Sequence, residues 1–447
     1  MWGCASAAYQ YEGATTEDGR GPCIWDAFAK EPGKIYGNEN ANIADDTYHR
    51  FAEDLQLLKN MGLKNYRMSI SWTRLFPTGK APLNLKGIEH YNKVFDLMKD
   101  MEIEPLVTLF HWDSPEHLED LYAGWLSPKI QSDFVNYART CFEYFGDRVK
   151  HWATINEPWT FCVNGYDIGT FAPGRCSDRS RCALGNSSTE AYLCGHNILN
   201  AHAAVVDLYR KKYQKTQNGI IGIVLNHDWS EPLTQSQHDI DAAQRANEFK
   251  ISWFADPLMH GDYPQIMKSN VGERLPKFTD EQKSLVKGSW DVFFLNHYTS
   301  MYYSSAPLNA SAGWEGDQGT ISTPYNSQGR LIGPRGDSTW LYIVPWGIQK
   351  VLEFSHNRYK GIDFATIKPN DAINPTKFQF IITENGMSVA NENIMTLSEI
   401  LEDTTRIEFY ETYLHYVYAA IVESGVDVRG YFAWSLLDNF EWNSGLR

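Results

Sequence analysis

Two glutamates stand at matched positions in distant parts of the chain. Glu157 ends the apolar run of "WATINEPW" and Glu384 ends that of "FIITENG", and a Pro or Gly follows each within two residues. A pair of carboxyl groups in one site suits acetal cleavage, because one can protonate the leaving oxygen while the other attacks or stabilises the cationic anomeric carbon. This chemistry requires a fold that brings the two runs together.

Alternating strand and helix patterns predict such a fold. Eight β-rich runs are expected to be strands, at residues 2–10, 64–72, 104–112, 151–158, 219–229, 290–298, 378–386 and 428–437. Helical periodicity lies between them, at residues 48–58, 87–101, 134–141, 189–214, 239–256, 347–359 and 403–424. Eight such units favour a closed (β/α)8 TIM barrel of the α/β class over an open sheet, which would more often carry a Gly-rich phosphate turn.

The chain is expected to form one domain over residues 1–447. Residues 304–338 are rich in Gly, Ser, Pro and Asn and are interpreted as an extended loop after the sixth strand, because the alternation resumes beyond them. The last strand is expected to end near Leu436, which leaves no room for an eighth helix before Arg447. Either another segment closes the barrel, or the sequence is a fragment whose barrel lacks its last C-terminal helix.

Residues at the strand ends are the candidates for a site, because the carboxyl ends of barrel strands form the active face. Amides, an imidazole and a carboxylate suit sugar hydroxyls, and indoles suit the apolar faces of a pyranose ring. The candidates are Gln10, Arg67, His111, Trp112, His227, Asn296, Tyr298, Trp434, Glu441 and Trp442.

The roles of the two glutamates follow from their expected neighbours. Arg67 could lie beside a strand-end carboxylate and hold it ionised as a nucleophile, whereas a carboxyl group without a nearby cation keeps its proton more easily. On this basis Glu384 is assigned as the nucleophile and Glu157 as the acid and base. The alternative for His111 and His227, that each is only a packed, hydrogen-bonded histidine, stays open.

Composition and charge exclude several classes of protein. Hydrophobic residues make up 43% of the chain and aromatic residues 14%, which is typical of a globular protein with a large core. The net charge of −15 disfavours nucleic acids and anionic membranes as partners. No run is long enough to span a membrane, and the first residues do not resemble a signal peptide. No Cys/His spacing suits a metal, and neither a metal nor a cofactor is expected.

The cysteines and two sequons bear on the compartment. Cys176 and Cys182 flank a polar loop and are predicted to form a disulfide in an oxidising compartment, the alternative being two free thiols in a cytosolic loop. Four others are expected to be buried small hydrophobes: Cys4, Cys141, Cys162 and Cys194. Asn186 and Asn309 are candidate glycosylation sites.

Six motifs together resemble glycoside hydrolase family 1, the retaining β-glucosidases and their relatives, over essentially the whole chain. They are "SAAYQYEGA", "YRMSISWTR", "FHWDSP", "TINEP", "ITENG" and "WSLLDNFEW". The resemblance implies a (β/α) barrel in which Glu157 is the acid and base and Glu384 the nucleophile. Against the family's pattern, residues 1–447 are expected to be truncated at the C-terminus and slightly at the N-terminus.

The same resemblance implies roles for the remaining candidates. Tyr298 would lie beside the nucleophile, with Arg67 and Asn296 as its support, and Trp340 would form a platform for the aglycone. The loop "APGRCSDRSRCALGNSSTEAY" is similar to the plant-type branch, in which the two cysteines form a disulfide, and this favours the secretory pathway (extracellular or vacuolar) over the cytoplasm. The non-reducing sugar would be held by Gln10, His111, Asn156, Trp434, Glu441 and Trp442.

The expected activity is hydrolysis of terminal β-D-glucosyl residues with retention, for which the two carboxyl groups should lie about 5 to 5.5 Å apart. Glu441 would repel a sugar phosphate, and the presence of Glu157 favours O-glycosides over thioglucosides. Two alternatives remain open, a transglycosidase that uses the same covalent intermediate and a non-catalytic barrel that binds glycans or proteins. A homodimer is an open alternative to a monomer.

Overall fold

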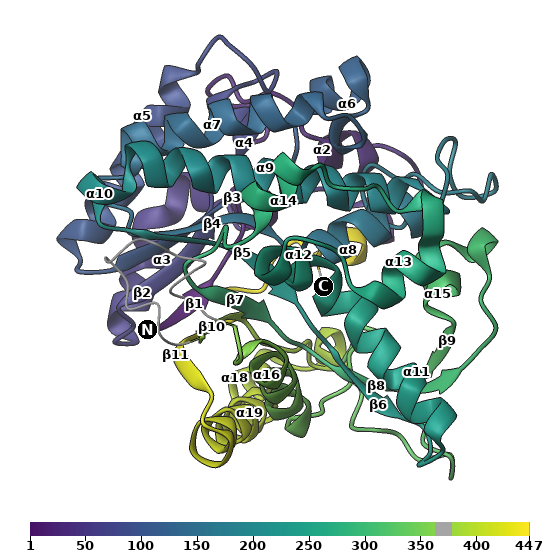
Figure 1. Cartoon of the computed structure of the whole chain (residues 1–447). Coiled ribbons are helices and arrows are strands. Elements are labelled where there is room, and N and C mark those ends of the chain that lie inside the picture. The colour runs from purple at the N-terminus through teal and green to yellow at the C-terminus, as the bar shows by residue number, and fades with distance from the viewer. Residues whose placement is uncertain (363–377, 447) are drawn as a thin grey trace.

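A closed barrel of eight parallel strands forms the centre of the molecule (Figure 1). The structure is a computed structural model that describes residues 1–362 and 378–446. The strands follow the order β1-β11-β10-β7-β5-β4-β3-β2 around the barrel. Their bounds are β1 Trp2–Ala5, β2 Asn65–Ser69, β3 Glu104–Phe110, β4 His151–Asn156, β5 Ile220–Asn226, β7 Phe293–Asn296, β10 Gln379–Glu384 and β11 Asp427–Ala433. The predicted α/β barrel is confirmed.

Two apolar clusters explain why these runs become barrel strands. Successive strand residues point to opposite faces, so a strand covered on both faces reads as a nearly continuous apolar run. Trp152 of β4 belongs to the large cluster and its neighbour Ala153 to the small one. The small cluster draws on almost every barrel strand: Ala5, Leu106, Ala153, Val224, Val292, Phe294, Ile381 and Phe432. Bulky and small side chains thus share the barrel interior, as in other packed barrels.

Long helices surround the barrel near the predicted positions. They are α3 Thr47–Asn60, α5 Leu85–Asp100, α7 Lys129–Phe145, α9 Glu190–Lys212, α16 Trp346–Tyr359 and α19 Thr404–Ser424. The segment predicted as one helix over residues 239–256 consists of α11 (Gln237–Asn247), the π-helix η4 (Glu248–Ser252) and α12 (Trp253–His260). The shorter α-helices are α1 Ala8–Tyr11, α2 Ile24–Phe28, α4 Trp72–Leu75, α6 Glu116–Tyr122, α8 Pro158–Val163, α10 Gln214–Gln217, α13 Gln265–Val271, α14 Asp280–Val286 and α18 Leu397–Leu401.

The region 304–338 was wrongly expected to be an extended loop. It contains α15 (Gly313–Gln318) and β9 (Thr320–Thr323), and its first residues belong to β8 (Ser300–Ser305). These strands join β6 (Trp229–Pro232) in a second sheet of order β6-β8-β9, on the side of the barrel where α11 and α15 lie (Figure 1). The polar composition concealed the strands because they are paired with distant segments and are partly exposed.

The end of the chain packs back onto its beginning. β11 ends at Ala433, three residues before the predicted Leu436, and the described residues beyond it form the 3-10 helix η8 (Trp442–Ser444) and no α-helix. The Tyr11 hydroxyl donates to the Leu437 carbonyl oxygen at 2.7 Å. This contact holds the segment after β11 against α1. Within residues 1–362 and 378–446, no helix has the length and apolar character needed to cross a membrane.

The part of the chain that the structure describes contains two disulfides, one more than the sequence suggested. Cys176 and Cys182 are joined as expected, with Cα atoms 5.5 Å apart. Cys162 and Cys194 are also joined, with Cα atoms 5.7 Å apart, so their assignment as unpaired hydrophobes was wrong. Both residues are buried, as unpaired core cysteines also are. Their pairing depends on the packing of α8 against α9, which the local sequence does not indicate. Cys4 and Cys141 are free.

The two disulfides should differ in their contribution to stability. A crosslink that closes a longer loop removes more entropy from the unfolded chain, and the sequence separations are 32 and 6 residues. In the chain-entropy model we expect the double variant Cys162→Ser/Cys194→Ser to lose roughly 4 kcal/mol of unfolding free energy and Cys176→Ser/Cys182→Ser roughly 2 kcal/mol. Urea unfolding of both variants tests this. A larger loss for the Cys176 and Cys182 pair would contradict it.

Candidate active site

The two glutamates lie at the carboxyl ends of their strands, as the sequence predicts. Glu384 is the last residue of β10, and Glu157 follows β4 directly and precedes α8, which begins with Pro158. Both are buried, with 4% and 6% of their surface exposed. Glu157 has a φ of 43°, a left-handed conformation that is uncommon outside glycine and often occurs at functional sites.

The carboxylate of Glu384 lies between a cation and a phenol. Arg67 of β2, fully buried, donates from Nη1 to Oε1 of Glu384, and the Tyr298 hydroxyl donates to Oε2 at 2.6 Å. A buried guanidinium in direct contact favours the ionised form of the carboxylate. Burial and the charge of Glu384 raise the pKa of Tyr298 well above its usual value, so this phenol remains a donor.

Glu157 has neutral hydrogen-bond partners. The Asn296 amide donates from Nδ2 to Oε1 of Glu157 at 2.6 Å, and the Thr160 hydroxyl donates to Oε2 at 2.7 Å. Asn296 is predicted to support Glu384; its Nδ2 donates to Glu157 and to Asn156 Oδ1, and its Oδ1 accepts from the hydroxyl of Thr383, the residue before Glu384. The reason is that β7 lies between β5 and β10 in the barrel, and its last side chain reaches toward the end of β4.

A chain of hydrogen bonds connects the two carboxyl groups. Asn156 Oδ1 accepts from Arg67 Nη2 at 2.6 Å and from Asn296 Nδ2 at 3.2 Å. Arg67 also contacts Glu384, and Asn296 also contacts Glu157. One side-chain oxygen thus fixes both groups that hold the glutamates. The backbone of Asn156 is fixed as well, because its carbonyl oxygen accepts from Trp112 Nε1 at 2.8 Å.

Electrostatics separate the two glutamates. Burial, and then the negative charge of Glu384, raises the pKa of Glu157 to about 8. Glu157 therefore carries a proton near neutral pH, whereas Glu384 faces the Arg67 charge. A proton on one carboxyl group and a cation beside the other suit a proton donor and an anionic nucleophile.

A third carboxyl group stands beside the pair. Burial and then the charge of Glu384 raise the pKa of Glu441 to about 7. Gln10 Nε2 donates to Asn439 Oδ1 at 2.8 Å and to the Phe440 carbonyl oxygen at 3.1 Å, and lies 3.5 Å from Glu441 Oε2. Oε1 of Gln10 is buried without a protein partner. The segment after β11 thus places the Glu441 carboxyl group beside the amide of Gln10.

His111 is enclosed by two indoles. Its ring stacks with Trp434 and Trp442, each with a centroid distance of 6.0 Å. Asn156 Nδ2 donates to Nε2 of His111 at 3.2 Å, and Nδ1 has no protein partner. Burial and then Arg67 lower the pKa of this histidine well below its usual value, so it is neutral. A neutral ring that accepts at Nε2 carries its proton on Nδ1, which is left as a free donor.

Three other candidates contact neighbouring rings or amides. Trp340 is 51% exposed and meets the Tyr298 ring edge-on at a centroid distance of 6.0 Å. His227 is buried, with Nε2 bonded to Asn247 Oδ1 at 2.9 Å, which agrees with a packed histidine. Trp112 lies against Trp442, with ring centroids 4.6 Å apart.

Thr160 was missed by the sequence analysis. It lies three residues after Glu157, and the helical turn that begins at Pro158 returns its hydroxyl to the carboxyl group. The Pro after Glu157 was a usable signal, since proline favours the first position of a helix and residues three apart share a face.

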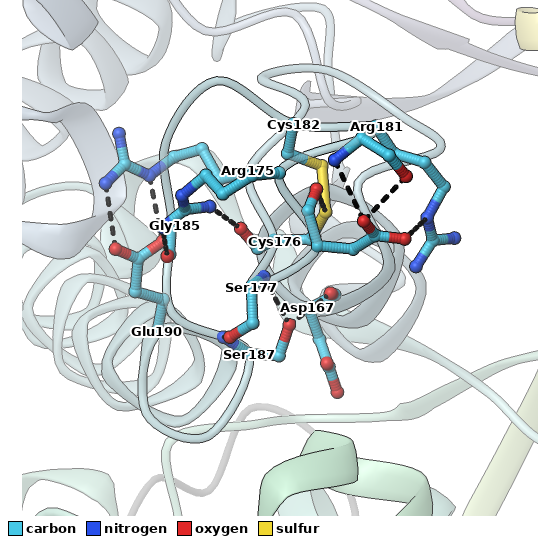
Figure 2. The surroundings of a disulfide bond; sticks show 12 residues. Asp167, Arg175, Cys176, Ser177, Arg181, Cys182, Gly185, Ser187 and Glu190 are labelled. Atoms are coloured by element: carbon cyan, nitrogen blue, oxygen red, sulfur yellow. Dashed lines mark hydrogen bonds and ion pairs between the residues drawn. A yellow bond between two sulfur atoms is a disulfide. The ribbon is translucent and has the colours of Figure 1, made fainter.

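The disulfide of the loop after α8 lies within a polar network (Figure 2). The backbone N–H groups of Ser177 and Ser187 each donate to the hydroxyl of the other residue at 2.9 Å, and Arg175 pairs with Glu190. The candidate glycosylation residues Asn186 and Asn309 are both exposed. Across the described parts of the chain, no group of three or more His, Cys, Asp or Glu side chains could hold a metal ion.

A parallel barrel with two buried carboxyl groups at its carboxyl end, one protonated and one beside a cation, defines a glycoside-cleaving enzyme of the barrel class. The family model described as glycosyl hydrolase family 1 matches residues 1–447, and the chain belongs to this family of retaining β-glucosidases.

Similar proteins come from plants and fungi. β-Glucosidase 40 of Arabidopsis thaliana is 48% identical over all of this chain and 85% of its own length. A rice Os3BGlu6 β-glucosidase variant in a covalent complex with glucose is 47% identical, with a TM-score of 0.94 over 100% of this chain and 91% of that one. A β-glucosidase from Humicola insolens in complex with glucose is 43% identical, with a TM-score of 0.93 over 100% and 90%. This chain is accordingly a β-glucosidase.

The protonation of Glu157 predicts a pH dependence. The first step requires the protonated acid, so kcat/KM for an alkyl β-glucoside should fall as pH rises through about 8. Burial and then the charge of Glu384 raise the pKa of Glu441 to about 7, so this group also titrates in the same range. The variant Glu157→Gln separates the effect of Glu157 from that of Glu441. Glu157→Gln should lose the limb near pH 8. An unchanged alkaline limb in this variant would show that another group causes it.

Proposed function

We propose that this β-glucosidase acts by double displacement with Glu384 as the nucleophile and Glu157 as the acid and base. The observation that carries the proposal is the contrast in partners, because Arg67 contacts Glu384 and only neutral donors contact Glu157. In the first step Glu157 protonates the glycosidic oxygen while Glu384 attacks the anomeric carbon, which forms a covalent glucosyl ester and releases the alcohol. We expect the carboxyl groups to lie about 5 to 5.5 Å apart.

The change of Glu157 from acid to base follows from the loss of one charge. Glu384 is the second cause of the raised pKa of Glu157. In the covalent intermediate Glu384 is a neutral ester, so this repulsion disappears and the pKa of Glu157 falls. The ionised Glu157 then takes a proton from a water molecule, which attacks the anomeric carbon and releases glucose with retention.

The non-reducing glucose is assigned to the group around Glu441. The partner-free Oε1 of Gln10 and Nδ1 of His111 supply one acceptor and one donor for sugar hydroxyls. Trp434 and Trp442 supply apolar faces, and Asn156 fixes the histidine. An ionised carboxylate at residue 441 would repel a phosphate, which favours an unphosphorylated sugar.

The aglycone is assigned to the exposed indole of Trp340. Its ring lies beyond Tyr298, which itself contacts Glu384, so the order of contacts runs outward from the nucleophile. An exposed aromatic face suits an aromatic or otherwise apolar leaving group. The acceptor in the second step, water or an alcohol, is determined by the same region, and hydrolysis is the proposed outcome. Two disulfides support the secretory pathway as the location.

Azide rescue tests the two roles separately. Glu384→Ala should lose activity by a factor on the order of 10⁴ or more. Azide can replace the missing nucleophile from the opposite face of the ring, so added azide should give the α-glucosyl azide. In Glu157→Ala azide should attack the covalent intermediate and give the β-glucosyl azide from a dinitrophenyl β-glucoside. NMR gives the anomeric configuration of each azide product. A β-glucosyl azide from Glu384→Ala and an α-glucosyl azide from Glu157→Ala would refute the assignment.

A substitution of Trp340 tests the aglycone site. Trp340→Ala should raise KM about fivefold for aryl β-glucosides, since one aromatic contact in a partly exposed setting contributes on the order of 1 kcal/mol. Inhibition by free glucose should be unchanged, because glucose does not reach this residue. Trp2→Ala is a matched control, as Trp2 is also exposed, at 59%, and lies in β1. Weaker glucose inhibition in Trp340→Ala would place this residue at the sugar instead.

A further inference from the structure

The two oxygens of the Glu157 carboxyl group have partners of different kinds. Oε1 accepts from the Asn296 amide nitrogen at 2.6 Å, and an amide N–H group can only donate. Oε2 accepts from the Thr160 hydroxyl at 2.7 Å, and a hydroxyl can donate or accept. The amide of Asn296 is held in this orientation, because its Nδ2 also donates to Asn156 Oδ1 at 3.2 Å, an oxygen that accepts from Arg67 and can only act as an acceptor. The donor at Oε1 is therefore fixed and the partner at Oε2 is adaptable.

This asymmetry identifies the oxygen that carries the proton. If Oε1 carried it, the short contact from Asn296 would go to a hydroxyl oxygen, which is a poorer acceptor than a carbonyl-type oxygen. With the proton on Oε2, Oε1 remains the better acceptor for the amide. The Thr160 hydroxyl can then accept from the protonated group, or donate to its oxygen when the proton points elsewhere.

We propose that Oε2 of Glu157 carries the catalytic proton and that Thr160 is a positioning residue that adapts to both protonation states of the acid and base. The inference rests on the proposed role of Glu157. In the first step the Oε2–H bond breaks and its proton forms the O–H bond of the departing alcohol, while the glycosidic C–O electrons remain on the leaving oxygen. The Thr160 hydroxyl turns to donate to the carboxylate that is left, and it holds the same carboxylate ready as the base of the second step.

The local structure suits a residue with this task. Thr160 is half-buried on the first turn of α8, and the Cys162–Cys194 disulfide anchors the same helix to α9. The position of the hydroxyl is thus set by the helix and a covalent link. The threonine hydrogen bond also lowers the pKa of Glu157 against the larger effects of burial and Glu384. Because Thr160 favours the ionised form of Glu157, it should matter most in the second step, in which the ionised Glu157 acts as the base.

Thr160→Val removes the hydroxyl and keeps the shape of the side chain. For a dinitrophenyl β-glucoside the leaving group needs no proton, so kcat/KM should change less than twofold while kcat, limited by the base-assisted second step, falls about tenfold, as expected for loss of one hydrogen bond to a charged group. For an alkyl β-glucoside kcat/KM should also fall about tenfold. The alkaline limb of its pH profile should move to higher pH, since a donor to the ionised form is lost.

Two further variants keep the test independent of folding. Thr160→Ser retains the hydroxyl and should restore both kcat and the pH profile. Thr140→Val is the matched control, because Thr140 is a buried helical threonine of α7 whose hydroxyl donates to the Asn136 carbonyl oxygen in the same helix, and its kinetics should match those of the parent protein. An equal fall of kcat/KM for both substrates without a shift of the limb would overturn the proposal, as would parental kinetics in Thr160→Val.

Neutron diffraction tests the assignment of the oxygen directly. Crystals of the unmodified protein kept below pH 7 should show deuterium on Oε2 of Glu157, and deuterium on Oε1 would overturn the inference. The outcome is separate from the proposed function itself. If Glu157→Ala gives no β-glucosyl azide, the role of Glu157 as acid and base fails, whereas normal azide rescue with parental kinetics in Thr160→Val refutes only the role of the threonine.

Discussion

The contact between Arg67 and Glu384 is the interaction on which the rest of the site depends. Two carboxyl groups buried at the same end of a barrel repel each other and lose their hydration, so both would become neutral without compensation. The fully buried Arg67 guanidinium pairs with Glu384, whereas burial and then the negative charge of Glu384 raise the pKa of Glu157. The cation beside one carboxyl group and the burial of the other therefore create the difference between the two glutamates. In the proposed mechanism, ester formation on Glu384 removes its charge and lowers the pKa of Glu157 again.

The barrel supplies the rigidity that this arrangement requires. Arg67, Asn156, Asn296 and Glu384 come from four different strands, β2, β4, β7 and β10, and each lies within its strand. Side chains on strands of a closed sheet are held more accurately than side chains on loops. Because Asn156 connects the partners of both glutamates, their distance is determined by strand register rather than by flexible segments.

The periphery of the site is built by different means. Glu157 sits just beyond its strand in a left-handed conformation, and α8 behind it is fixed to α9 by a disulfide. Glu441 lies in the irregular segment after β11, which is held by Gln10 and Tyr11 near the start of the chain. The proposed acid and base and the proposed sugar contacts thus lie on segments outside the strands, which need their own anchors. Gly386 shows how tight the packing is, because an added Cβ atom there would lie 1.8 Å from the Trp434 carbonyl oxygen.

The sequence by itself determined the barrel, the positions of its strands within a few residues and the two glutamates at their ends. These features follow from local patterns, since a strand buried on both faces must be apolar and a catalytic residue must stand where it ends. Only the tertiary structure decided that the Asn296 amide nitrogen donates to Glu157, that the Thr160 hydroxyl reaches the same carboxyl group, that Cys162 joins Cys194 and that β8 and β9 join β6 in a second sheet. Each of these depends on which segments become neighbours in space, and neighbours are set by barrel closure and helix packing, which no local run of residues encodes.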